Sequence, residues 1–381
     1  MIRKIISIIL VAVLALSCAS GCTQDPVQPN GVAVKQELTL DTAAISSCGY
    51  LVETENGYYY SGFGGLVYAD KSDLTNWVLV CNDPTCDHTL ATCPAKVFGG
   101  ITIQDGRIFT MRPMEDFQMG SGFGIFSMKM DGTDLRFEHA IEAMSFPSGG
   151  YHLSVSCTGS GVFYCGASGL QTDGTYLNSL ITADKASSSV LMQKTSNDQS
   201  NSVFDLDTSV RGDLLFYSDA LHPNEDSQQH LYRITEDGVE DGSAIAKLNP
   251  QCGYLSGDNL YHYISGKGYY WTQISSGTSQ KWMDAQLDNG IAYYLTDGFI
   301  VEHNMTYGHI PEKPQLLFYD GESWAEIELP ADWVVDGAAG AFPLALTTEH
   351  IFFNRYQEGT NNLYFVNHTD PDPVLTLCGQ F

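Results

Sequence analysis

The residues best suited to chemistry lie together in one short segment, which contains three cysteines and one histidine: Cys81, Cys86, His88 and Cys93. Sulfur and imidazole nitrogen are the soft ligands that suit tetrahedral zinc. The spacing, C-x4-C-x-H-x4-C, differs from that of a standard zinc knuckle. Because four protein ligands leave no coordination position open for a substrate or water, a metal here would be structural rather than catalytic.

A disulfide is the competing interpretation of the same segment. Cysteines outside the cytoplasm usually form disulfides, so two of the three cysteines could pair within the segment and the third elsewhere. The chain offers these further partners: Cys48, Cys157, Cys165, Cys252 and Cys378. A metal explains why a histidine accompanies the thiols, which a disulfide does not. Metal, disulfide and free thiols all remain open at this point.

Other catalytic signals are weak. The sequence contains no G-x-S-x-G nucleophile elbow and no HExxH helix motif. Carboxylates are plentiful, but glycoside hydrolysis needs two of them about 5 to 9 Å apart, which is a relation in space. Trp271, Trp282 and Trp333 could form a platform for sugars, although aromatic residues at strand spacing more often fill contacts between sheets. We therefore assign no catalytic residue.

The N-terminus predicts export and a lipid anchor. Arg3 and Lys4 precede an apolar run over residues 5–16 that is too short to span a membrane and is typical of a signal peptide. Residues 19–22, Ala-Ser-Gly-Cys, resemble a bacterial lipobox. We predict a signal peptide over residues 1–21, lipid attachment at Cys22 and a flexible tether over residues 22–34. Cys18 is the weaker alternative attachment site, and an ordinary secreted protein is the alternative to a lipoprotein.

Charge narrows the choice of partners. The 381 residues include 18 basic and 45 acidic side chains, a formal charge of −27. Such a charge repels nucleic-acid phosphates and anionic lipid surfaces. We therefore expect no nucleic-acid partner. The expected partners are the membrane, through the lipid, and an extracellular protein, peptide or glycan.

The pattern of residues 35–381 predicts an all-β repeat structure. A turn residue followed by a tight apolar strand recurs seven times, at 57–60, 106–109, 161–164, 212–217, 258–261, 290–294 and 349–353. The mean spacing is about 49 residues, which falls in the range of propeller blades. A strand ending in an acidic turn follows most units, as at 66–70 and 231–238, and a shorter strand such as 77–80 closes the repeat.

With the stretch before each unit, this gives four antiparallel strands per repeat. We predict a β-propeller of seven four-stranded blades, with six or eight remaining open and a pair of β-sandwiches as the alternative fold. The fifth and sixth blades are the least regular, because the step from Leu260 to Ile291 is short and the next is long.

The repeated texture, of the form DGxIY…LYRxxxDG, resembles bacterial lipoproteins whose propellers are similar to TolB and low-density-lipoprotein-receptor propellers. The cysteine segment resembles an LCxxPxCxHxxxxCxA element of the same group. The match covers the three cysteines, His88, Pro84 and Ala95, with Val80 in place of leucine. Tyr68 followed by Trp77 resembles a kelch blade, but the kelch diglycines do not recur, so that family is not assigned.

The sequence thus predicts a protein lipid-anchored outside the cytoplasm, whose propeller is a non-enzymatic binding or scaffold module for a protein, peptide or glycan. The alternative is a glycosidase or lyase acting on extracellular polysaccharide. The cysteine segment should cross between two blades, on a face where propellers commonly bind ligands; this is an analogy from the fold.

Overall fold

The computed structural model describes residues 45–46 and 50–381, apart from 63–64, 142–150, 158–160, 198–203, 212–213, 220–227, 236–237, 247–253, 306–310, 331–332, 334–341 and the single positions 265, 274, 289, 297, 312 and 358. For some strands it describes the backbone alone. The predicted signal peptide, Cys22 and the tether lie outside the described residues, as do Cys48 and Cys252. No helix in the described part is long and apolar enough to cross a membrane.

The described strands form seven antiparallel sheets, numbered here in chain order. The first contains β2 (Leu51–Glu53), β3 (Gly57–Gly62), β4 (Gly65–Asp70) and β5 (Asp73–Leu79). The second contains β6 (Phe98–Gln104), β7 (Arg107–Pro113), β8 (Phe123–Lys129) and β9 (Arg136–Ile141), with the 3-10 helix η1 (Glu115–Phe117) between β7 and β8. The third contains β10 (Tyr151–Cys157), β11 (Phe163–Leu170), β12 (Tyr176–Ala183) and β13 (Ser188–Ser196).

The fourth sheet contains β14 (Phe204–Arg211), β15 (Leu214–Asp219), β16 (Gln228–Thr235) and β17 (Gly238–Ala246); only its backbone is described. The fifth contains β18 (Tyr254–Ser256), β19 (Asn259–Ile264), β20 (Gly268–Gln273) and β21 (Ser279–Met283). The sixth contains β22 (Ile291–Tyr294), β23 (Ile300–His303), β24 (Leu316–Tyr319) and β25 (Trp324–Glu326). The seventh contains β26 (Phe342–Leu346), β27 (His350–Gln357), β28 (Thr360–Asn367) and β29 (Thr376–Gln380), and β1 (Ile45–Ser46) joins it beside β26.

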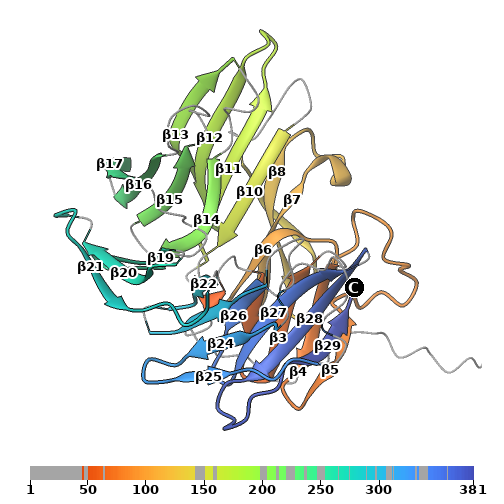
Figure 1. Ribbon diagram of the computed structural model, residues 1–381. Helices are drawn as coiled ribbons and strands as arrows, with labels where there is room; N and C mark the ends of the chain where they lie inside the picture. Colours follow the sequence, from red (N-terminus) through yellow and green to blue (C-terminus); the bar gives the residue numbers. More distant parts are fainter. Residues whose placement is uncertain are drawn as a thin grey trace, which may run out of the picture.

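The sheets follow one another around a ring in chain order (Figure 1). Strand β2 contacts β6, β6 contacts β10, β10 contacts β14, β14 contacts β18, and β19 contacts β22. The sixth and seventh sheets share one apolar core, and β29 of the seventh returns to contact β5 of the first. This closed succession of four-stranded sheets is a β-propeller, which confirms the predicted all-β propeller fold. Side chains are described in every sheet except the fourth.

One repeat unit was assigned to the wrong strand. Residues 290–294 correspond to β22, the first strand of the sixth sheet, whereas the other six units correspond to second strands. The true second strand is β23, which starts at Ile300 and pairs with β24. Both β22 and β23 are four residues long, and each follows a turn that contains a glycine, so pairing with neighbouring strands is needed to distinguish them. This shift accounts for the short step before Ile291 and the long step after it.

In the first, second, sixth and seventh sheets, both faces are buried against neighbouring sheets. Successive side chains of a strand point to opposite faces. In β3, Tyr58 and Tyr60 pack against the seventh sheet, whereas Tyr59 packs against the second. In β27, Phe352 faces the first sheet and Phe353 the sixth. Apolar runs without polar alternation are therefore expected in the middle strands, as the repeat units show.

The seam between the seventh and first sheets closes the ring. The Tyr58 ring packs edge-on against Phe352 with centroids 4.9 Å apart, and its hydroxyl lies 3.0 Å from Nδ1 of His350. Glu53 is fully buried and accepts hydrogen bonds from the backbone N–H of Thr348, at 2.9 Å, and from its hydroxyl, at 3.1 Å. Lys71 completes the arrangement with Nζ 2.6 Å from Glu53. The carboxylate thus joins two sheets almost 300 residues apart in sequence.

We expect Glu53→Ala to lower the free energy of unfolding by about 3 kcal/mol, because hydrogen bonds to a buried charged group and the Lys71 pair are lost together. Urea denaturation measures the change. Glu55→Ala is the matched control, since Glu55 is exposed in the neighbouring turn, and it should change stability by less than about 0.5 kcal/mol. Equal stability of the two variants would show that the carboxylate does not hold the seam.

Candidate metal centre

The predicted cysteine segment lies in the connection between β5 and β6, residues 80–97, called the cysteine loop below. It therefore links the first and second sheets, as predicted. Its end is fixed to the first sheet by a hydrogen bond of 2.7 Å from the Leu66 N–H to the Ala95 carbonyl. Gly65 permits this approach, because its φ is +116° and a Cβ there would lie 2.8 Å from the Ala95 oxygen.

The four predicted ligands come together. Their candidate ligand atoms, three Sγ and one imidazole nitrogen, all lie within 4.8 Å of one another. Cys81 and Cys93 are buried, while Cys86 and His88 are half-buried. Tetrahedral zinc with bonds of about 2.3 Å to sulfur places sulfurs roughly 3.8 Å apart. The cluster thus fits a metal ion after a small contraction.

The backbone presents a hydrogen-bond donor to each sulfur. The N–H two residues after each cysteine donates to it: Asp83 to Cys81, His88 to Cys86 and Ala95 to Cys93. The His88 N–H lies 3.4 Å from Sγ of Cys86, and Nδ1 of His88 lies 3.5 Å from Sγ of Cys93. Such donors favour thiolate over thiol. The three sulfurs are therefore held in the surroundings that a thiolate–metal centre requires.

Local turns produce this arrangement. Asp83 accepts hydrogen bonds from the N–H and hydroxyl of Thr85, and Asp87 does the same for Thr89. These Asx turns hold the pKa of both carboxyls below the usual range. Between them, His88 adopts φ of 60°, the left-handed region that few residues other than glycine occupy. Backbone strain at a histidine of this kind is typical of a functional position.

Burial acts against ionisation of two thiols. It raises the pKa of Cys81, and it raises the pKa of Cys93 to about 12, although the backbone donors oppose both shifts. Both thiols are consequently protonated near neutral pH when no metal is bound. A metal ion therefore displaces protons as it binds.

The five cysteines whose side chains are described are free thiols; the side chain of Cys157, a further predicted partner, lies outside the described part. Outside the cysteine loop, Cys165 lies in the core between the second and third sheets, and Cys378 lies in the core of the closing seam. Neither belongs to the small apolar cluster around Cys81 and Cys93. The two are therefore not disulfide partners for the loop in this structure.

Arg112 is a component of the centre that sequence reasoning missed. It lies on β7, is 1% exposed, and donates from Nη2 to the carbonyls of Ala91 and Cys93, the latter at 2.8 Å. Its guanidinium carbon lies 4.9 Å from the ring centroid of Phe117, in η1. One buried side chain thus joins the cysteine loop to the β7–β8 connection. The period-two pattern of Ile108, Thr110 and Arg112 was the available signal, since it places a charge on an interior face.

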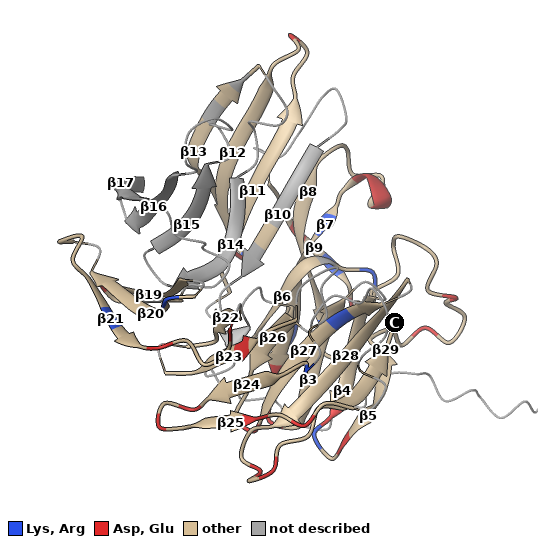
Figure 2. Ribbon diagram, viewed as in Figure 1, with Lys and Arg blue, Asp and Glu red and all other residues tan. Residues whose placement is uncertain are grey.

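Many of the described acidic side chains lie in turns and at strand ends (Figure 2). Glu53 and Glu302 are the only buried carboxylates among the described side chains. Glu302 accepts from the Tyr269 hydroxyl at 2.5 Å and from the backbone N–H of Leu287 at 2.9 Å. It thereby links the fifth and sixth sheets as Glu53 links the seventh and first. Each carboxylate is occupied by donors, and the two belong to non-adjacent sheets, so they form no acid–base pair.

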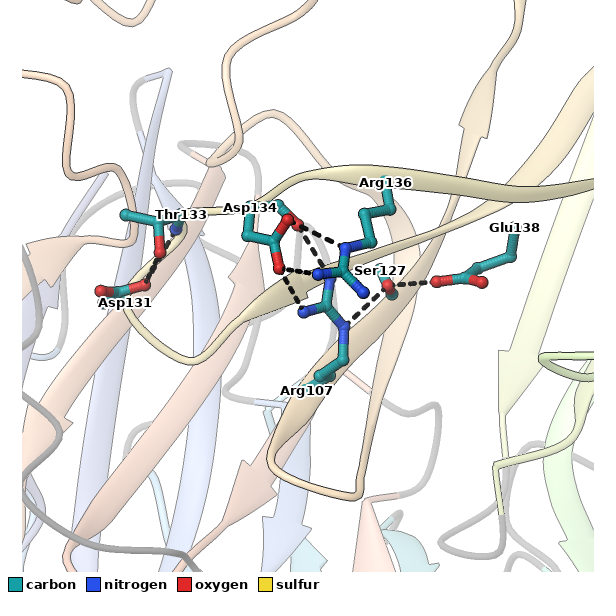
Figure 3. A network of polar contacts seen from close by, with 7 residues as sticks. All are labelled: Arg107, Ser127, Asp131, Thr133, Asp134, Arg136 and Glu138. Atoms are coloured by element: carbon teal, nitrogen blue, oxygen red, sulfur yellow. Dashed lines mark hydrogen bonds and ion pairs between the residues drawn. The ribbon is translucent and has the colours of Figure 1, made fainter.

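A polar network on the second sheet has a structural explanation (Figure 3). Asp134 is 3.0 Å from Nη1 of Arg107 and also pairs with Arg136, which lowers the pKa of the aspartate. Ser127, which is fully buried, accepts from Nε of Arg107 at 3.0 Å and donates to Glu138. The charges compensate one another and the serine is enclosed. The network ties β7, β8 and β9 together and presents no free nucleophile.

The tryptophans fill contacts between sheets. Trp333 is 3% exposed, packs on Tyr364 with centroids 4.9 Å apart, and donates to Sδ of Met305. Trp282 packs in the core around Tyr269, and Trp271 is half-buried on β20. Trp271 and Trp282 lie on neighbouring strands of the fifth sheet, whereas Trp333 lies in the core between the sixth and seventh sheets, so the three do not form one platform for a sugar.

The fold and the cluster define an all-β propeller with a candidate thiolate–imidazole metal centre in one inter-sheet connection. No family model and no curated protein matches the chain. Solved structures with distant similarity include the β-propeller domain of the Trilobed protease from Pyrococcus furiosus, with 12% identity, TM-score 0.41 and coverage of 73% of this chain and 84% of that one. Another is BamB from Moraxella catarrhalis, with 10% identity, TM-score 0.38 and coverage of 83% and 96%. A third is the computationally designed Ika8 protein, with 9% identity, TM-score 0.41 and coverage of 88% and 87%. The fold assignment rests on the sheet topology and not on these similarities.

We expect purified protein to contain one zinc atom per chain, and Cys81→Ser to lose it. At zinc a thousandfold above the Kd, the variant should lose about 4 kcal/mol of unfolding free energy, because binding to the folded state alone contributes that amount. Elemental analysis and thermal unfolding measure the two effects. Cys165→Ser is the control: it also changes a buried thiol but should keep the metal. Absence of metal, with a mass lower by two hydrogens per cysteine pair, would instead identify a disulfide.

Proposed function

We propose that this chain is a lipid-anchored protein displayed outside the cytoplasm, whose propeller is a non-enzymatic binding or scaffold module. In this proposal a structural zinc ion held by Cys81, Cys86, His88 and Cys93 fixes the cysteine loop. The zinc crosslinks a connection that has few other apolar contacts of its own. The result is a rigid surface feature suited to a protein, peptide or glycan partner, with a protein or peptide favoured.

The observation that carries this proposal is the display of apolar side chains on clamped segments. Leu90, between the second and third cysteines, is 63% exposed, and Met119, after η1, is 50% exposed. Arg112 holds together the two segments that bear them. A rigid segment loses little conformational entropy on binding, so exposed apolar residues placed on it contribute efficiently to affinity. Apolar contacts of this kind favour a protein or peptide partner.

Export and anchoring are supported by the sequence features already described: the positive start, the apolar run of residues 5–16, and the lipobox-like residues 19–22. The resemblance to propeller lipoproteins agrees with them. The cysteine loop would then face the extracytoplasmic space, where a metal-bound thiolate centre protects cysteines from uncontrolled oxidation.

Binding is tested with peptide, protein and glycan arrays probed with the purified protein. We expect specific binding that falls at least tenfold in the double variant Leu90→Asp/Met119→Asp, because buried apolar contacts would be replaced by desolvated charges. Val190→Asp is the matched control, since Val190 is 42% exposed on β13, in another sheet. Failure of the wild type to bind any probe, or equal binding by all three proteins, would contradict the proposed binding face.

Anchoring is tested in the producing bacterium by labelling with palmitate and separating membrane from soluble fractions. We expect Cys22→Ala to lose the label and leave the membrane fraction, because the lipid would be the sole hydrophobic anchor. Cys18→Ala should remain labelled and membrane-bound. The reverse pattern would move the attachment site to Cys18, and unlabelled wild type would refute the lipid anchor.

A further inference from the structure

Arg112 places a positive charge in the interior of the protein, on β7, where charged side chains are unusual. One face of β7 packs towards the first sheet and carries Ile108, Thr110 and Arg112. Ile108 is apolar and Thr110 is uncharged, so Arg112 is the one charged residue on this face. Arg112 is 1% exposed, so its guanidinium is removed from water. Burying an unpaired guanidinium is expensive unless an opposite charge lies near.

No carboxylate forms an ion pair with Arg112 in the described part of the chain. The partners of Nη2 are two carbonyl oxygens, and Nη1 has no hydrogen-bond partner among the described residues. Phe117 and Phe126 cover the guanidinium at 4.9 and 6.0 Å. The nearest acidic influences are Asp116, which is exposed, and the Cys93 thiol. Among the groups near Arg112, the cysteine cluster is therefore the one that is buried and can become negatively charged.

A metal-bound centre would provide the negative charge that Arg112 lacks among its neighbours. A divalent ion with three thiolates and one neutral imidazole carries a net charge of −1. We propose that Arg112 is a positioning residue of this centre: its buried positive charge balances the anionic thiolate–metal cluster, and its two carbonyl contacts fix the loop for metal binding. This inference rests on the zinc site proposed above. Arg112 would then increase the metal affinity through its charge, in addition to its contribution to packing.

The test compares Zn²⁺ affinities of full-length proteins by competition with a chromophoric chelator. Arg112→Met keeps an unbranched side chain but removes the charge and the hydrogen-bond donors, so it should weaken Zn²⁺ binding by about tenfold or more, as is usual when a group that supports metal ligands is removed. Arg112→Lys keeps the charge and should stay within about threefold of the wild type. Sulfur-to-metal charge-transfer absorption of the Co²⁺ forms checks that the ligand set is unchanged.

Arg355→Met is the matched control. Arg355 is also buried, at 2% exposed, donates to a carbonyl, that of Trp333, at 2.7 Å, and stacks on that ring at 4.1 Å, but it lies in the seventh sheet. Its loss should lower stability and leave Zn²⁺ affinity unchanged.

Equal affinity of Arg112→Met and wild type would overturn the role of Arg112 while leaving the zinc site intact. A wild type that binds no metal would overturn both. If Arg112→Met does not fold, Arg112→Lys decides: affinity near that of the wild type supports charge balance, and a tenfold loss contradicts it.

Discussion

The constraint on which the rest of the structure depends is closure of the ring. The first, second, sixth and seventh sheets each have two apolar faces, and each face is removed from water only if a neighbouring sheet covers it. Tyr58 and Tyr60 would be left exposed without the seventh sheet, and Phe352 without the first. The seam therefore combines aromatic packing with a buried carboxylate, Glu53, whose acceptor atoms meet donors from both sheets. Glu302 has the same role between the fifth and sixth sheets.

The cysteine loop adds a local constraint to this global one. Residues 83–92 of the loop are exposed or half-buried, so their conformation depends on hydrogen bonds or crosslinks. Here the Asx turns at Asp83 and Asp87 set the local geometry, and a metal ion would tie together residues at both ends of the loop. Arg112 carries that order into the β7–β8 connection through Phe117. Metal binding would thereby stabilise the conformation of both connections.

The propeller fold and the four candidate metal ligands were predictable from the sequence, and the predictions that were wrong or missing have physical causes. Strand texture and spacing located the middle strands of six sheets, because apolar runs bounded by turns are a local property. The prediction for the sixth sheet was wrong because β22 and β23 are both four-residue strands that follow a glycine-containing turn. Only strand pairing, a non-local property, shows which of them is the second strand. The four candidate ligands were found because they are close in sequence. Arg112 and Glu53 were not, since their burial depends on a neighbouring sheet that spacing alone does not reveal.

Zinc K-edge X-ray absorption of the purified protein shows whether three thiols and one imidazole form a single metal centre. We expect a first shell of three sulfurs at about 2.3 Å and one nitrogen at about 2.0 to 2.1 Å. The nitrogen should be replaced by another light ligand in a variant lacking His88, with the sulfurs retained. A shell of oxygen or nitrogen alone, or protein without bound zinc, would contradict the account.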